Sequence, residues 1–157
     1  MSEHTATVRW ERGSAPFVDN RYSRAHTWLF DGGLSVPASA SPHNVRPPFC
    51  DPAGVDPEEA YVAALSSCHM LWFLSLAAAE GFVVDRYSDE AIGTLEKDEH
   101  GRDAITCVTL RPRVRFSGPR VPDPARIARL HDEAHYRCFI ANSVRTRIAV
   151  ESAGAEE

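Results

Sequence analysis

Two cysteines, Cys68 and Cys138, are the residues in this chain best suited to covalent chemistry. Cys68 lies near the middle of the longest apolar stretch, and Cys138 follows a later helical pattern seventy positions on. The thiolate is the nucleophile, and a cysteine in the middle of a helix gains little from the helix dipole. A reactive Cys68 therefore needs a cation from elsewhere in the fold. The alternative is that Cys68 is simply a small core residue.

A long helix must hold Cys68. Asp56 is a good N-cap, Pro57 suits the first helical position, and Gly81 supplies a stop after Glu80. Residues 60–79 are polar at only four positions, so this helix is apolar on nearly every side. Such a helix is buried in protein or lies in a membrane, and a length of roughly 36 Å permits either.

We expect burial, because a histidine and three serines interrupt the run and charged amphipathic elements surround it. One chain of this size has little mass to cover so long a helix. A homodimer in which two such helices pack together would solve that problem, and we expect one.

The remaining pattern predicts six strands and a second helix. A turn signal, Asp31-Gly32-Gly33, indicates a hairpin in the N-terminal part, and a proline-rich segment at 40–55 indicates a long ordered loop. The expected strands are 5–11, 24–30, 34–39, 82–97, 104–116 and 145–151, with the second helix at 123–136. The order βββ-α-ββ-α-β predicts an α+β fold in a single domain of residues 1–157, with a frayed tail at 152–157.

Composition narrows the class of protein. The chain has 157 residues, 43% of them apolar and 25% charged, which is ordinary for a soluble globular domain. A net charge of −5 with no separate basic block argues against a nucleic-acid partner. The N-terminal residues lack the regions of a signal peptide, so we expect a cytoplasmic protein. Four scattered cysteines do not form a disulfide framework, and no Cys-x-x-Cys or His-x-x-x-His pair indicates zinc; we expect no metal and no bound cofactor.

Three segments carry a resemblance to a known family. They are Asp-Pro-Glu-Glu-Ala at 56–60, Ala-Ala-Leu-Ser-Ser-Cys at 63–68 and Ala-His-Tyr-Arg-Cys-Phe-Ile-Ala-Asn-Ser at 134–143. Together with the order of elements, they resemble the OsmC/Ohr family, the osmotically inducible protein C and organic hydroperoxide resistance proteins. Phe139 stands where the Ohr branch usually has proline, so the chain resembles an OsmC-like branch. The resemblance implies the OsmC-like fold in an intertwined homodimer.

The resemblance also implies the roles of four residues. Cys68 would be the peroxidatic cysteine and Cys138 the resolving one. An arginine from the N-terminal strands and a glutamate at the start of the central helix would complete the site. The glutamate corresponds to Glu58, and the arginine to Arg24, with Arg21 as a second choice. Ten helical residues separate Glu58 from Cys68 by roughly 15 Å, so either Arg24 spans the gap or, as we prefer, the partner subunit supplies the glutamate.

The implied activity is that of a cytoplasmic, thiol-dependent peroxidase in oxidative stress defence. It would reduce organic hydroperoxides to alcohols through a Cys68 sulfenic acid and a Cys68–Cys138 disulfide, with an external dithiol, such as a dihydrolipoyl group, as the reductant. Apolar side chains near the thiol would favour organic peroxides; the candidates are Met70, Trp72 and Phe139. The rival interpretation is a non-enzymatic dimer of the same fold that binds an apolar small molecule in an interface pocket. His69, next to Cys68, is a proton donor to the leaving alkoxide or a core histidine.

Overall fold

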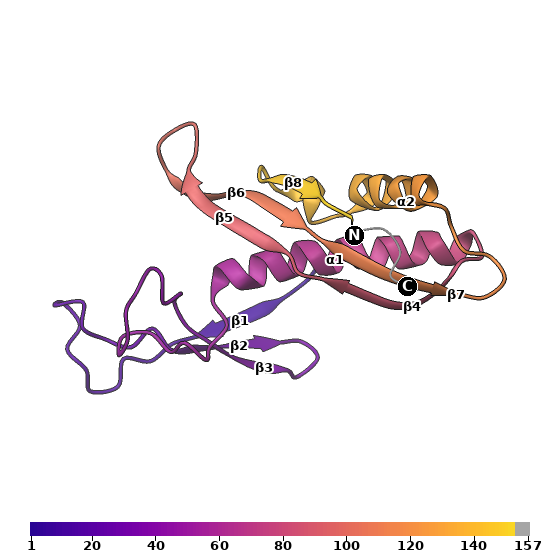
Figure 1. The fold of residues 1–157 in the computed structure, drawn as a ribbon. Helices are drawn as coiled ribbons and strands as arrows, with labels where there is room; N and C mark the ends of the chain where they lie inside the picture. The colour runs from indigo at the N-terminus through magenta and orange to yellow at the C-terminus, as the bar shows by residue number, and fades with distance from the viewer. Residues whose placement is uncertain (153–157) are drawn as a thin grey trace. The chain divides into compact units, whose positions relative to one another are not determined.

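The computed structural model describes residues 1–152. The chain forms two compact units, residues 1–60 and residues 61–157 (Figure 1). The frayed tail expected at 152–157 lies outside the described residues, apart from Ser152. The single domain expected for the whole chain stays a prediction.

The first unit contains a three-stranded antiparallel sheet in the order β1-β2-β3. Its strands are β1 (Ala6–Arg9), β2 (His26–Phe30) and β3 (Ser35–Ala38). The expected hairpin joins β2 to β3, and Gly33 takes a positive φ of 84° in its turn. The long loop after β3 is ordered: the Ser39 hydroxyl accepts a hydrogen bond of 2.9 Å from the Asp51 backbone N–H.

The central helix, α1 (Pro57–Ala79), begins and ends where the sequence predicts. Asp56 and Glu59 form a capping box. The Glu59 N–H donates to Asp56 Oδ1 at 2.8 Å, and the Asp56 N–H donates to Glu59 Oε2 at 3.2 Å. Gly81 ends the helix with a φ of 77°, a conformation that glycine adopts at little cost.

The second unit has more strands than expected. The predicted strand 82–97 is two strands, β4 (Val83–Asp89) and β5 (Ile92–Lys97). The predicted strand 104–116 is likewise β6 (Asp103–Leu110) and β7 (Pro112–Ser117). Both breaks have one cause. The Arg111 N–H donates to the Asp89 carboxylate instead of a strand carbonyl, and Pro112 has no N–H to donate, so the ladder is interrupted there.

These strands form two small sheets in this unit. β4 pairs with β7, while β5, β6 and β8 (Arg147–Val150) form the other sheet, in which β6 and β8 run parallel. The second helix, α2 (Pro124–Arg137), is capped by Asp123 and followed by a 3₁₀ turn, Ala141–Ser143. The α+β class is confirmed, with βββ-α-ββββ-α-β as the observed order.

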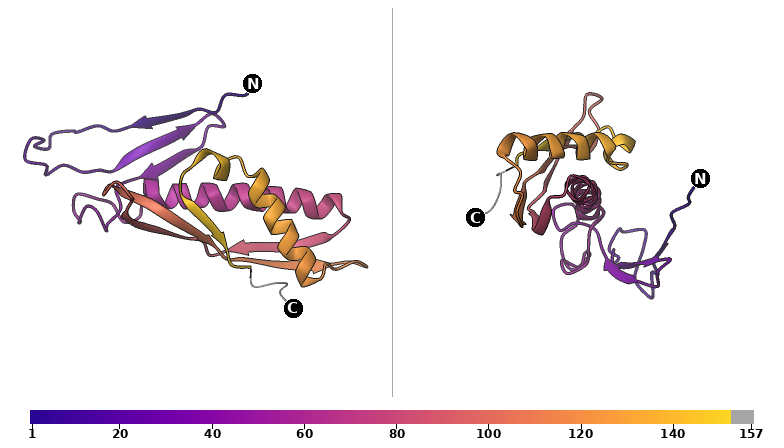
Figure 2. Two further views of the ribbon diagram at one scale, coloured as in Figure 1. Left: turned by 90° about the horizontal axis from the view of Figure 1, so that it is seen from above. Right: turned by 90° about the vertical axis from the view of Figure 1, so that its right-hand side faces the viewer.

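The core of the second unit lies between its helices and its strands. One cluster joins Phe73 and Ala77 of α1 to Val114 of β7 and Leu130 of α2. A second joins Leu65 of α1 to β6, through residues 108–110. Figure 2 shows α1 and α2 beside the same strands. This packing places one face of α1, with Cys68 near its centre, against the end of α2.

Another face of α1 is open. Leu71 is 61% exposed, and its neighbours along this face are small: Ala64, Ser67, Ser75 and Ala78 are exposed as well. The single chain therefore leaves part of α1 uncovered, and the expected burial of this face in a homodimer stays a prediction. By length and composition alone α1 could also cross a membrane, since its mean hydropathy reaches 1.6, but core helices of soluble proteins share these properties.

Candidate active site

The two cysteines singled out in the sequence meet in the second unit. Cys68 lies half-buried on α1, and Cys138, the C-cap residue of α2, is 1% exposed. The two thiols lie close enough for Cys68 to affect the pKa of Cys138, and both are free. Seventy residues of chain separate them, so the packing of α2 against α1 creates this pair. Two thiols in contact can form a disulfide with little movement of the chain.

The surroundings distinguish Cys138 from Cys68. Burial, with a smaller contribution from the neighbouring Cys68, raises the pKa of the Cys138 thiol to about 11, and the Ala141 N–H opposes this shift. Cys138 therefore keeps its proton at neutral pH.

Arg24 and Glu58 lie in the first unit. The Arg24 guanidinium donates hydrogen bonds to Asn20 and Tyr22, and it makes no ion pair with any residue of the described part of the chain. Glu58 Oε1 accepts a hydrogen bond of 3.1 Å from Asn44 Nδ2. The expected contacts, of this arginine with the Cys68 thiol and of this glutamate with the arginine, stay a prediction.

Two of the three expected substrate-binding residues line one hollow. Trp72 and Phe139 pack edge to face with ring centroids 5.5 Å apart, and both line a cavity of about 610 Å³. Trp72 stands one turn after Cys68 on α1, and Phe139 directly follows Cys138. Met70 is half-buried on α1 and is not among the residues that line this cavity. Neither cysteine is among the residues that line this cavity, but each has a close sequence neighbour in its wall.

A pair of buried histidines lies beside the thiols in the sequence. His69 Nε2 and His131 Nδ1 are 3.0 Å apart, and the two rings are stacked with an interplanar angle of 9°. Burial lowers the pKa of His69 to about 4, helped by His135 and opposed by Asp89. Burial, helped by His69, lowers the pKa of His131 to about 3. Both imidazoles are neutral at pH 7, so His69 holds no extra proton for a leaving alkoxide.

The sequence contained a signal for this pair that the prediction did not use. His131 and His135 stand four residues apart on α2, so their side chains project from the same side of that helix. This is the side that faces His69. His69 Nδ1, His131 Nε2 and His135 Nδ1 are buried without a hydrogen-bond partner. Within residues 1–152, no group of three His, Cys, Asp or Glu side chains is placed to hold a metal ion.

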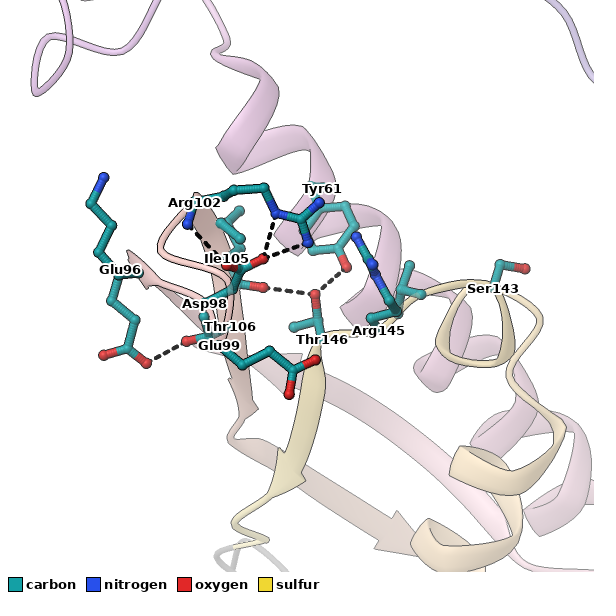
Figure 3. Close-up of a pocket in the computed structure, with 13 residues that line it drawn as sticks. Tyr61, Glu96, Asp98, Glu99, Arg102, Ile105, Thr106, Ser143, Arg145 and Thr146 are labelled. Atoms are coloured by element: carbon teal, nitrogen blue, oxygen red, sulfur yellow. Dashed lines mark hydrogen bonds and ion pairs between the residues drawn. The ribbon is translucent and has the colours of Figure 1, made fainter.

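A larger hollow lies away from the cysteines. It measures about 830 Å³ and sits at the turn between β5 and β6 (Figure 3). Tyr61 donates to or accepts from Thr146 at 2.6 Å on its wall, and Arg102 is paired with Asp98 at its rim. None of the expected site residues lines this hollow, and its walls carry both signs of charge.

Comparison with known proteins identifies the family. The family model described as OsmC-like protein matches residues 50–153, which include both cysteines. The chain belongs to the OsmC family. A solved OsmC-like protein of unknown function from Vibrio cholerae is 54% identical, with a TM-score of 0.95 over 97% of this chain and 99% of that one.

More distant members share the OsmC fold. An organic hydroperoxide resistance protein from Elizabethkingia anophelis is 16% identical, with a TM-score of 0.70 over 97% of this chain and 94% of that one. The corresponding protein of Bacillus subtilis is 19% identical, with a TM-score of 0.60 over 99% and 98% of the two chains. A comparison with curated proteins gives no match.

Proposed function

We propose that this protein is a cysteine-based peroxidase that reduces organic hydroperoxides to alcohols. The observation that carries the proposal is the pair of neighbouring free thiols, Cys68 and Cys138, in a chain of the OsmC family. A core cysteine needs no second cysteine in contact with it. Peroxide reduction through a disulfide does.

The reaction proceeds in three balanced steps. The Cys68 thiolate attacks the terminal oxygen of the hydroperoxide, the O–O bond breaks, and the alkoxide takes a proton and leaves as an alcohol. The resulting Cys68 sulfenic acid reacts with the Cys138 thiol, forming an S–S bond and releasing water. An external dithiol then reduces the disulfide and is itself oxidised, which returns both cysteines to thiols. A dihydrolipoyl group fits this last step.

A cation is needed to favour the Cys68 thiolate, and Arg24 is the residue we assign to it. A guanidinium keeps its charge at every pH of interest and binds an anion along a planar edge. Glu58 would hold that guanidinium by a charge-assisted hydrogen bond. Arg24 and Glu58 both belong to the first unit. In this proposal they act on the thiols of their own chain or on those of a partner subunit.

The partner we propose is a second copy of this chain. The exposed face of α1 around Leu71 is apolar or small along its length, and burying it against another α1 would remove that surface from water. The substrate class follows from the cavity of Trp72 and Phe139, which offers aromatic surface to the organic group of a hydroperoxide.

Turnover measurements test the activity. Reduced protein is incubated with cumene hydroperoxide and dihydrolipoamide beside the variants Cys68→Ser and Cys138→Ser, with Cys107→Ser as the matched control. We expect turnover by the wild type and by Cys107→Ser, and none by Cys68→Ser. Absence of turnover in the wild type would overturn the peroxidase proposal and leave the apolar-ligand binder in its place.

A further inference from the structure

The loop before β2 holds Arg24 in an unusual way. Its guanidinium Nη1 donates to the carbonyl of Asn20 at 3.0 Å and to the carbonyl of Tyr22 at 2.5 Å, and Nη2 donates to Asn20 Oδ1 at 2.7 Å. Asn20 is the only residue other than glycine with a positive φ in the described part of the chain, at 63°. The backbone carbonyl of Asn20 and its side-chain Oδ1 therefore both accept hydrogen bonds from one guanidinium.

Counting donors shows which edge of the guanidinium stays free. Arginine has five N–H donors, two on each Nη and one on Nε. The three hydrogen bonds use both donors of Nη1 and one of Nη2. The remaining donors, on Nε and Nη2, lie on the same side of the planar group and are parallel. That edge can bind one anion with two hydrogen bonds.

An aromatic cluster fixes the plane of the guanidinium. Arg24 Cζ lies 4.0 Å from the centroid of the Tyr22 ring. That ring stacks on Phe17 with centroids 4.7 Å apart and meets Trp10 edge to face at 5.4 Å. Trp10 Nε1 donates to the Ser23 carbonyl at 2.7 Å, which ties the cluster to the same loop. Two further aromatic side chains thus hold the Tyr22 ring.

We propose that Asn20 and Tyr22 are positioning residues that hold the Arg24 guanidinium in one orientation, with its Nε and Nη2 edge presented to an anion. The orientation removes in advance the rotamer freedom that a flexible arginine loses on binding. The anion is the Cys68 thiolate, so this part of the proposal rests on the proposed function.

The neighbouring arginine lacks such a support. Arg21 is exposed, and its side chain makes no hydrogen bond, ion pair or ring contact with the described residues; only its backbone N–H is bound, to Asp19. The two arginines were both open as candidates from the sequence. We call the hydrogen bonds and the ring contact by which Asn20 and Tyr22 hold Arg24 the cradle. The cradle favours Arg24 over Arg21 as the arginine that binds the thiolate.

The orientation is measured directly by NMR. The ¹⁵N-labelled full chain gives a heteronuclear NOE for the Arg24 Nε–H, a signal assigned by its loss in Arg24→Lys. We expect a wild-type value near that of rigid backbone amides. Asn20→Gly keeps the left-handed backbone and the carbonyl but removes Oδ1, and Tyr22→Leu removes the ring, so both should lower the NOE.

Conservative variants serve as matched controls. Asn20→Asp keeps the side-chain acceptor, and Tyr22→Phe keeps the ring, so both should preserve the NOE of the Arg24 Nε–H. A mobile Nε–H in the wild type would overturn the cradle. An NOE unchanged in both Asn20→Gly and Tyr22→Leu, in protein with wild-type circular dichroism, would do the same.

The catalytic consequence is read from Cys68. Asn20→Gly should slow alkylation of Cys68 by iodoacetamide at pH 7 and lower kcat/KM for cumene hydroperoxide by about tenfold, with KM for the dithiol unchanged. Asn20→Asp should alkylate at the wild-type rate. An alkylation rate unchanged in Asn20→Gly would overturn the catalytic part. If the NOE results hold while Arg24→Lys and Arg24→Ala turn over normally, the cradle stands and the catalytic role of Arg24 in the proposed function is wrong.

Discussion

At the scale of single residues, the chemistry depends on the different environments of two sulfurs. Cys138 is buried, and burial holds its proton, whereas Cys68 is half-buried. The sequence could indicate both cysteines, because Cys68 lies within one recognisable helical pattern and Cys138 follows another. It could not show that their side chains touch, since that depends on how α2 packs on α1.

Selective alkylation tests this difference. With a pKa of about 11, Cys138 is only about 1% thiolate at pH 9, since each pH unit below the pKa lowers that fraction tenfold. Mass spectrometry after iodoacetamide treatment at pH 9 should find Cys68 modified before Cys138. Cys68→Ser should leave Cys138 slow, because burial remains. Equal modification of both thiols in folded protein would contradict the structure.

The buried histidine pair makes stability depend on pH. Unfolded histidine has a pKa near 6.5, whereas the folded values are about 4 for His69 and about 3 for His131. Between pH 6.5 and 4 the unfolded chain binds more protons, so the free energy of unfolding falls as the pH falls, by up to about 1.4 kcal/mol per pH unit for each histidine.

Urea unfolding at pH 7, 6 and 5 measures this dependence. His131→Gln removes one titrating group, so its pH dependence should be about half that of the wild type. His100→Gln, at an exposed turn position, is the matched control and should behave as the wild type. A wild-type unfolding free energy that does not change between pH 7 and 5 would contradict the burial of the pair.

At the scale of elements, local signals predicted the helices well and the strands only in part. Asp56, Pro57 and Gly81 mark the ends of α1 by capping, which is a short-range effect. The division of two long strands into four depends on a contact between Asp89 and Arg111, twenty-two residues apart. No local pattern around either residue reports that contact.

The packing of α1 on β5 leads to a prediction at this scale. A Cβ added at Gly93 would lie 2.6 Å from Val62 Cγ2, too close for the two atoms to coexist. Gly93→Ala should therefore lower the free energy of unfolding by about 1–3 kcal/mol. Urea denaturation measures it. Gly32→Ala is the control, because a Cβ there meets nothing within 4 Å. The double variant Gly93→Ala with Val62→Ala should recover part of the lost free energy of unfolding.

At the scale of the whole molecule, the open face of α1 is the feature that a single chain leaves unexplained. An apolar helix of this length indicates an interface, but the sequence alone does not say which residues form it. Within one chain, α1 uses Leu65, His69, Phe73 and Ala77 for its own core. The face around Leu71 is what remains for a partner.

The oligomeric state tests this assignment. Leu71→Glu places a charge in the proposed interface and should convert a dimer into a monomer in sedimentation velocity measurements. Leu34→Glu changes a residue of equal exposure, 62% against 61%, in the β2–β3 turn, and should leave the dimer intact. A wild-type monomer, or a Leu71→Glu dimer, would exclude this face as the interface.

The most direct measurement is the mass of the protein after one equivalent of cumene hydroperoxide, with remaining thiols blocked by N-ethylmaleimide. The account predicts the loss of two hydrogen atoms and a peptide map in which a disulfide joins Cys68 to Cys138. Recovery of Cys138 as its maleimide adduct would contradict the account, whether Cys68 is unoxidised or has been oxidised to the sulfinic acid.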